Sequence, residues 1–158
     1  MIEAVTKPGE IEPSYARDSG ALESAAFVFH HHGLALQDDA DALLVVQLLG
    51  YTVGAVVHDP LQDVRLRLCT HPTMPAIEIV MPGDRPGPLD GVLRRHAQLI
   101  YHTCYEVADR EAALAALEEA GVRLIEVLAP VPAVLFDGRK VSFHAAMGFG
   151  LIELLDRQ

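Results

Sequence analysis

The sequence predicts an α+β fold that consists of two βαβββ modules. Three observations support this class. The order strand, helix and three strands occurs twice, and both predicted helices begin at aspartates and end at a glycine. The third observation is a matched pair of polar residues: Glu78 follows His31 by 47 residues, and Glu153 follows His102 by 51. A duplicated module can bring corresponding residues together around a pseudo-twofold axis, so these four are expected to share one site.

The first module is predicted to cover residues 27–82. In its first strand, residues 27–36, alternation places His31 and Gly33 on one face, where small neighbours leave room for a ligand. The following helix starts with aspartates that suit free N–H groups and the helix dipole, and Gly50 can close it in a left-handed conformation. Asp-Pro and His-Pro turns separate the later strands. The helix and these strands are expected at residues 38–50, 51–57, 64–69 and 76–81.

The second module, residues 99–158, repeats this order. Its helix is rich in alanine, which has the highest helix propensity, and Gly121 is the predicted stop. Asp137-Gly138 marks a tight turn before the penultimate strand. The strand, the helix and the three final strands are expected at residues 100–107, 109–120, 122–128, 141–144 and 150–155.

Two segments lie outside the modules. Residues 1–26 are polar, broken by prolines and glycines, and lack a sustained period, which predicts a loosely packed N-terminal arm. Residues 83–98 are the predicted linker, because residues 81–88 contain three prolines and two glycines. A short helix is expected after them, at residues 89–96.

The composition narrows the class of protein. Hydrophobic residues make up 51% of the 158, enough for a real core. The formal charge of −10 repels phosphate backbones, which disfavours nucleic acid as a partner. No apolar run reaches the roughly 18–20 residues that cross a membrane, so a cytoplasmic protein without a membrane anchor is expected. Cys69 and Cys104 are expected to be reduced core residues.

The four matched residues have the chemistry of a metal site. Imidazole nitrogens with carboxylate oxygens suit a divalent ion of intermediate hardness, such as Co²⁺, Ni²⁺, Zn²⁺ or Mn²⁺. Glu78 and Glu153 stand within apolar strands, where an unpaired carboxylate is costly. The alternative is that each histidine is a satisfied core residue and each glutamate lies on a solvated face of the sheet.

The remaining histidines and the paired basic residues have simpler expectations. By alternation, His30 and His32 face away from the His31 side of the strand. Histidines near predicted turns or strand ends are expected at the surface; they are His71, His96 and His144. Arg94-Arg95 and Arg139-Lys140 are expected to be solvated, with contact to the phosphates of an acyl-CoA as the alternative.

Five segments in order resemble the vicinal oxygen chelate superfamily, and most closely its methylmalonyl-CoA epimerase and glyoxalase-like branch. Together they cover about residues 27–156. The segments are His31-His32-Gly33-Leu34-Ala35-Leu36, Ile77-Glu78-Ile79-Val80-Met81-Pro82, Tyr101-His102-Thr103-Cys104-Tyr105-Glu106-Val107, Gly138-Arg139-Lys140-Val141-Ser142-Phe143 and Leu151-Ile152-Glu153-Leu154. The resemblance implies a curved, half-barrel mixed sheet and often a homodimer.

The resemblance also implies a metal site and a reaction. His31, Glu78, His102 and Glu153 match the positions that bind the divalent metal. The implied reaction is proton transfer next to a carbonyl whose oxygens chelate the metal, with an acyl-CoA or another acyl thioester as substrate. Glu153 is the matched candidate for a ligand that also acts as the base.

The chain departs from these epimerases where a second acid or base is expected. They carry a Pro-Glu-Gln-Gly-Val-like segment in the first module, whereas this chain has His58-Asp59-Pro60-Leu61-Gln62-Asp63-Val64, with Leu61 in place of the glutamate. Asp59, Asp63 and His58 are the candidates for the missing catalytic group. The alternative for each is a turn or solvent residue, since Asp-Pro often starts a turn.

Three functions are compatible with these residues. The first is a metal-dependent isomerase or epimerase. The second is a glyoxalase-like lyase that uses the same four ligands on another substrate. The third is a small-molecule binding or resistance protein without catalysis, which the retained carboxylates disfavour because sequestration needs no metal. The fold alone does not choose between them.

Overall fold

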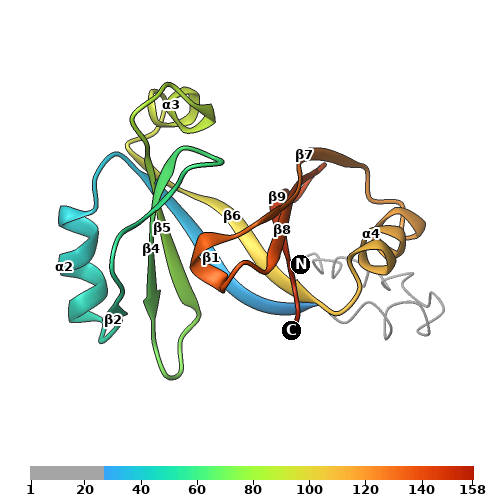
Figure 1. Ribbon diagram of the computed structural model, residues 1–158, viewed down its shortest axis with the longest axis horizontal. Coiled ribbons are helices and arrows are strands. Elements are labelled where there is room, and N and C mark those ends of the chain that lie inside the picture. Colours follow the sequence, from blue (N-terminus) through green and yellow to red (C-terminus); the bar gives the residue numbers. More distant parts are fainter. Residues whose placement is uncertain (1–26) are drawn as a thin grey trace, which may run out of the picture.

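The structure is a computed structural model that describes residues 27–158 (Figure 1). The arm expected over residues 1–26 lies outside this range. Within the described residues, no helix is long and apolar enough to span a bilayer. The cytoplasmic location and the homodimer stay predictions.

The described residues form one mixed sheet with short helices at its ends. The strands are β1 (Val28–Leu36), β2 (Thr52–Val53), β3 (Val57–Asp59), β4 (Val64–Thr70), β5 (Ala76–Pro82), β6 (Gln98–Val107), β7 (Leu124–Pro132), β8 (Lys140–Ala146) and β9 (Gly150–Asp156). The helices are α2 (Ala40–Leu48), α3 (Pro88–Leu93) and α4 (Arg110–Glu119), with a 3₁₀ turn η1 (Val134–Phe136). The expected α+β class is thus confirmed, with α3 shorter than predicted.

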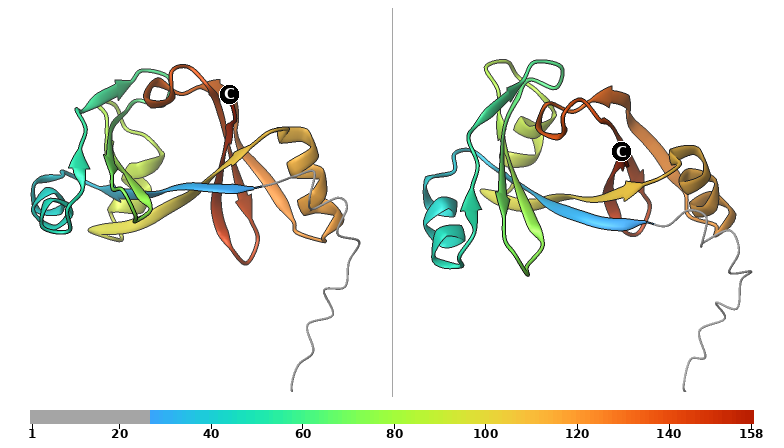
Figure 2. Two further views of the ribbon diagram at one scale, coloured as in Figure 1. Left: turned by 90° about the horizontal axis from the view of Figure 1, so that it is seen from below. Right: turned by 60° about the horizontal axis from the view of Figure 1, so that its bottom comes forward.

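The strand order shows the duplication directly. It runs β2-β4-β5-β1-β6-β9-β8-β7, with β3 also paired to β4. In each half the first strand is parallel to the last, β1 with β5 and β6 with β9. The two halves join through the antiparallel pair β1 and β6. In Figure 2 these two strands form the floor of a curved sheet whose outer strands rise on both sides.

Each half carries its helix outside the curve, as the two ends of Figure 1 show. Ile79 on β5 packs toward α2, in a cluster with Val46. Leu154 on β9 packs toward α4, in a cluster with Ala113 and Ala116. Because side chains alternate along a strand, the neighbouring residues of β5 and β9 face the concave side.

The two helices start differently. The Asp109 carboxylate accepts a hydrogen bond from Ala112 N at 3.0 Å, as a cap does. The Asp39 carboxylate forms no cap and instead pairs with Arg67 Nε at 2.7 Å. Both helices end as predicted, since Gly50 has φ 87° and Gly121 has φ 85°.

The strand predicted over residues 51–57 is broken into β2 and β3. The break lies at Gly54, whose N–H donates to Leu68 O at 2.9 Å. A Cβ at Gly54 would be 2.7 Å from that oxygen, so only glycine allows this close approach. The chain then enters β3, which ends at Asp59, a residue of the cavity lining.

Candidate metal centre

Four strands bring the four matched residues together on the concave side of the sheet. His31 comes from β1, Glu78 from β5, His102 from β6 and Glu153 from β9. All four residues are buried, and none is more than 4% exposed. The sequence prediction that these residues share one site is therefore matched by their placement.

The sheet register explains why they meet. His31 pairs with Cys104 across β1 and β6, and Cys104 pairs with Glu153 across β6 and β9. In the other half, His102 pairs with Gly33, and Gly33 pairs with Glu78 across β1 and β5. Each histidine is thus one strand away from a small residue that is itself next to a glutamate. The two rows are related by the pseudo-twofold axis.

The donor atoms converge on one point. His31 Nε2 lies 3.2 Å from His102 Nε2, 3.2 Å from Glu153 Oε2 and 3.5 Å from Glu78 Oε2. His102 Nε2 lies 3.3 Å from each of the two carboxylate oxygens. Zinc-type bonds of about 2.1 Å place neighbouring ligand atoms about 3.0–3.4 Å apart in tetrahedral or octahedral geometry. The spacing fits a divalent ion among the four.

A buried carboxylate oxygen without a hydrogen bond supports this fit. Glu153 Oε2 makes no hydrogen bond within the described part of the chain, although it points toward two imidazoles. A buried polar atom left unpaired is costly and rare in native structures. A cation among the four donors removes that cost.

The charges of the four groups are strongly linked. Burial lowers the pKa of His102, but the carboxylates of Glu153 and Glu78 outweigh it and raise this pKa to about 9. Burial raises the pKa of Glu153, but the imidazoles of His102 and His31 outweigh it and hold this pKa well below its usual range. The carboxylates are therefore ionised and ready to bind a cation.

Gly33 is required by the ring of His102. A Cβ at Gly33 would lie between 2.2 and 2.6 Å from three atoms of this imidazole. No larger residue fits unless the imidazole moves. His102 also packs edge-on against Phe143, with ring centroids 5.2 Å apart.

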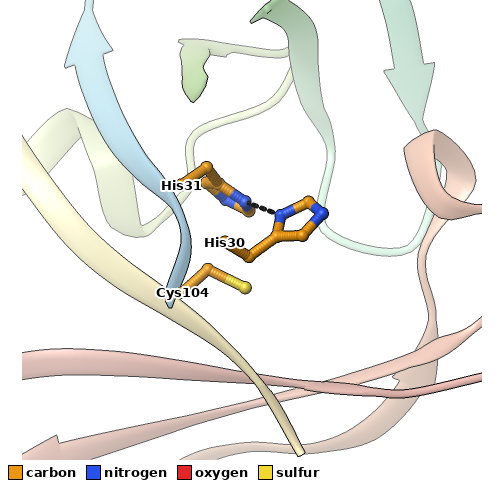
Figure 3. A group of neighbouring side chains, drawn as sticks. All are labelled: His30, His31 and Cys104. Atoms are coloured by element: carbon orange, nitrogen blue, oxygen red, sulfur yellow. Dashed lines mark hydrogen bonds between the residues drawn. The ribbon is translucent and has the colours of Figure 1, made fainter. Parts of the chain in front are cut away.

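A β-bulge changes the expected direction of His30. The pairing of β1 with β6 shifts between Phe29 and His31, so His30 is an extra residue in the ladder. Figure 3 shows the His30 ring turned toward His31, whose Nδ1 lies 2.7 Å from His30 Nδ1. The prediction that His30 faces away from His31 is wrong, because simple alternation does not hold across a bulge.

A mostly apolar cavity of about 290 Å³ opens next to the four donors. Glu78, His102 and Glu153 are part of its lining. The other lining residues come from strands of both halves and from η1. They include Leu66, Tyr101, Leu128, Leu135, Phe136 and Leu151. No sequence pattern predicts η1, because its short apolar run has neither strand nor helix periodicity.

The structure separates the candidates for the second acid or base. Asp59 is 1% exposed and lines the cavity. Its carboxylate accepts hydrogen bonds from Leu61 N at 2.8 Å and from Gln62 N at 3.2 Å and Gln62 Nε2 at 3.1 Å. Asp63 does not line this cavity.

Asp63 instead belongs to a network at the surface. Its backbone adopts the left-handed conformation, with φ 52°. Its carboxylate accepts from Arg85 N at 2.8 Å and lies 3.2 Å from His58 Nε2. The backbone hydrogen bond from Arg85 lowers the pKa of Asp63, and His58 adds to this effect. His58 and Asp63 thus join the turn after β3 to the linker.

Two further expectations from the sequence are wrong. His144 is 4% exposed rather than at the surface, and its Nε2 lies 3.0 Å from Ser142 Oγ on the same strand. Arg139 is partly buried rather than fully solvated, and its Nη1 donates to Glu106 Oε1 at 2.5 Å. The two cysteines are free and buried, as predicted.

A curved sheet of two βαβββ modules around paired histidines and glutamates is the vicinal oxygen chelate fold. Residues 30–143 match the model of the Glyoxalase/Bleomycin resistance protein/Dioxygenase superfamily, and the chain belongs to this superfamily. The superfamily and the curved mixed sheet expected from the motifs are thus confirmed.

Individual proteins that the chain resembles are epimerases of acyl-CoA compounds. The Ethylmalonyl-CoA/methylmalonyl-CoA epimerase of Cereibacter sphaeroides is 36% identical over 98 residues, which are 61% of this chain and 72% of the relative. The methylmalonyl-CoA epimerase of Mycobacterium tuberculosis has a similar fold, with TM-score 0.67 and 22% identity over 83% of this chain and 88% of that one. A variant of the Streptomyces coelicolor methylmalonyl-CoA epimerase, in complex with 2-nitronate-propionyl-CoA, has TM-score 0.67 and 19% identity over 83% and 98% of the two chains.

The close approach of Gly33 to His102 gives a test of the site. Gly33→Ala is expected to displace the imidazole and lower the affinity for Co²⁺ at least 10-fold, as titration calorimetry measures. Gly91→Ala is the control, because its new Cβ meets only Arg94 Nη2, at 3.8 Å. Equal Co²⁺ affinities of the two variants would contradict the role of Gly33.

Proposed function

We propose that the chain is a metal-dependent epimerase-type enzyme that moves a proton at the carbon next to the carbonyl of an acyl-CoA. The observation that carries this proposal is the cluster of two histidines and two glutamates beside an apolar cavity. The name of the Cereibacter sphaeroides relative supports the reaction and the substrate class.

His31, Glu78, His102 and Glu153 are the proposed ligands of a divalent ion such as Co²⁺, Ni²⁺, Zn²⁺ or Mn²⁺. When bound, such an ion polarises the substrate carbonyl and stabilises the negative charge that develops on its oxygen. All four ligands come from strands of one sheet, which holds them more rigidly than loops do.

Glu153 is the proposed base. Its Oε2 faces the imidazoles, which leaves Oε1 to accept the proton from the substrate. Glu153 also lines the cavity in which the acyl group would lie. A general base needs to be within hydrogen-bond reach of the proton that it removes, and this placement provides that reach.

Asp59 is the proposed group for the opposite face of the substrate. Of the two aspartates considered from the sequence, Asp59 lines the cavity, whereas Asp63 is tied to Arg85 and His58 away from it. The hydrogen bonds from Leu61 and Gln62 hold the Asp59 carboxylate in place. The side chain of Leu61 has no group that can exchange a proton with the substrate.

The cavity suits the acyl part of the substrate. Its volume of about 290 Å³ is lined mostly by aliphatic and aromatic side chains. Pockets for entire drug-sized ligands are about 300–1,000 Å³. The short acyl group would therefore be enclosed, while the larger nucleotide part of the CoA would extend outside.

The proposal is tested by isotope exchange in heavy water. Protein loaded with Co²⁺ is expected to bind one ion per site and to introduce deuterium at the α carbon of methylmalonyl-CoA or ethylmalonyl-CoA, as mass spectrometry measures. Removal of the metal should lower this rate at least 100-fold. Metal-loaded protein that exchanges neither substrate would overturn the epimerase assignment in favour of a glyoxalase-like lyase. Protein that binds no divalent metal would overturn the enzyme assignment in favour of a small-molecule binding protein.

The duplication supplies a matched pair of variants for the base. Glu153→Gln and Glu78→Gln each remove one carboxylate ligand, so similar losses of Co²⁺ affinity are expected. Only Glu153→Gln also removes the base, which should lower exchange at saturating Co²⁺ about 10²–10⁴-fold further than Glu78→Gln does. Equal exchange rates in the two variants would refute the assignment.

The second proton carrier is tested by separating exchange from inversion. Asp59→Asn keeps an oxygen for the turn but no longer moves a proton. In this variant, one enantiomer of the substrate is expected to keep exchanging its α proton with solvent. Its conversion to the other enantiomer should fall at least 100-fold. Circular dichroism and mass spectrometry measure the two rates. Loss of inversion in Asp63→Asn, but not in Asp59→Asn, would move the role to Asp63.

A further inference from the structure

A line of polar contacts leads from the proposed metal site to the surface through the β-bulge at His30. His31 offers Nε2 to the metal site, so its second ring nitrogen, Nδ1, faces away from the other three ligands. His30 Nδ1 lies 2.7 Å from that atom (Figure 3). The bulge makes this contact possible, because an unbroken strand would turn the His30 ring to the other face of the sheet.

We propose that His30 is a positioning residue that fixes the ring orientation and the tautomer of His31. This role, which rests on the metal site proposed above, follows from the two ring nitrogens. Nε2 of His31 needs a free lone pair to bind a metal, so the proton of the neutral ring lies on Nδ1. Nδ1–H of His31 then donates to Nδ1 of His30, which accepts. Partners of this kind raise the basicity of a ligand histidine.

The outer end of the line is anchored by charge. The other nitrogen of His30, Nε2, lies 4.0 Å from Glu106 Oε1, which is within ion-pair distance of this carboxylate. Arg139 Nη1 holds the same oxygen at 2.5 Å. Phe136 covers both imidazoles, with its ring centroid 5.1 Å from that of His30 and 5.5 Å from that of His31. The His30 ring thus lies between a carboxylate, the Phe136 ring and the neighbouring imidazole.

The second module has no counterpart of this line. Nδ1 of His102 is buried and has no hydrogen-bond partner among residues 27–158. The residue before it is Tyr101, whose ring packs edge-on against the imidazole instead. His102 is therefore held by packing, and His31 by a hydrogen bond. The contact between His30 and His31 is therefore specific to the first module and not a consequence of the duplication.

The test compares metal affinity in three variants. His30→Leu removes the acceptor and is expected to lower the affinity for Co²⁺ by about 10–100-fold, the usual cost of losing the partner of a ligand histidine. His30→Asn keeps an oxygen near the position of Nδ1 and should recover most of this loss. His32→Leu is the control, because His32 adjoins His31 on its other side. Its Nδ1 has no hydrogen-bond partner in the described residues.

A second measurement reports the hydrogen bond itself. Long-range ¹H–¹⁵N correlation spectra of Zn²⁺-loaded protein identify the tautomer of each histidine ring. In the wild type, His31 is expected as the Nδ1–H form with a strongly downfield proton, and His30 as the Nε2–H form. The His31 proton should move upfield in His30→Leu and return toward its wild-type position in His30→Asn.

The outcomes separate this role from the metal site. Wild-type protein that binds neither Co²⁺ nor Zn²⁺ would overturn the proposed site, and the role of His30 with it. Wild-type binding together with a His30→Leu affinity within twofold of wild type would overturn the role of His30 alone. A His30→Leu protein that fails to fold leaves the decision to the His30→Asn affinity and to the wild-type spectrum. A His31 ring without an Nδ1–H hydrogen bond in that spectrum would also overturn the role.

Discussion

The antiparallel pairing of β1 with β6 is the constraint on which the rest of the molecule depends. It joins the two halves at their first strands, so the histidine of each half lies beside the partner strand of the other. The parallel strands β5 and β9 then add one glutamate on each side. A slip of this pairing by one residue would send each histidine to the opposite face of the sheet. The precision of the cluster therefore depends on backbone hydrogen bonds.

Four ionisable side chains in such a small buried volume are unfavourable without compensation. Isolated charges in an apolar interior are costly, and the two carboxylates repel each other. The imidazoles offset this repulsion when they carry protons, as the raised pKa of His102 shows. A divalent ion would take the place of those protons, so metal binding at this site releases protons to solvent. The buried cluster is thus a place where protons and a metal compete.

The sequence predicts the features that depend on local patterns, such as strand faces and helix ends. Alternation in β1 places His31 correctly, and the glycine stops end both helices where they were expected. The bulge at His30 could not be predicted, because it is set by pairing with residues more than seventy positions later. The break at Gly54 likewise depends on a carbonyl of β4. The lining from η1 results from its packing against β3 and β4 of the other half, and Asp63 is drawn away from the cavity by Arg85 of the linker. No local pattern contains these contacts.

The two rows of the site are no longer interchangeable, and this limits how the chain could be rebuilt. Gly33 in the first half and Cys104 in the second occupy equivalent places next to a histidine. A protein made of two copies of the second half would place a cysteine where His102 leaves no room for a Cβ. Two copies of the first half would have glycine at both places and a supporting histidine behind each ligand. The two halves therefore hold their histidines by different means, one with a neighbouring imidazole and the other with space at a glycine.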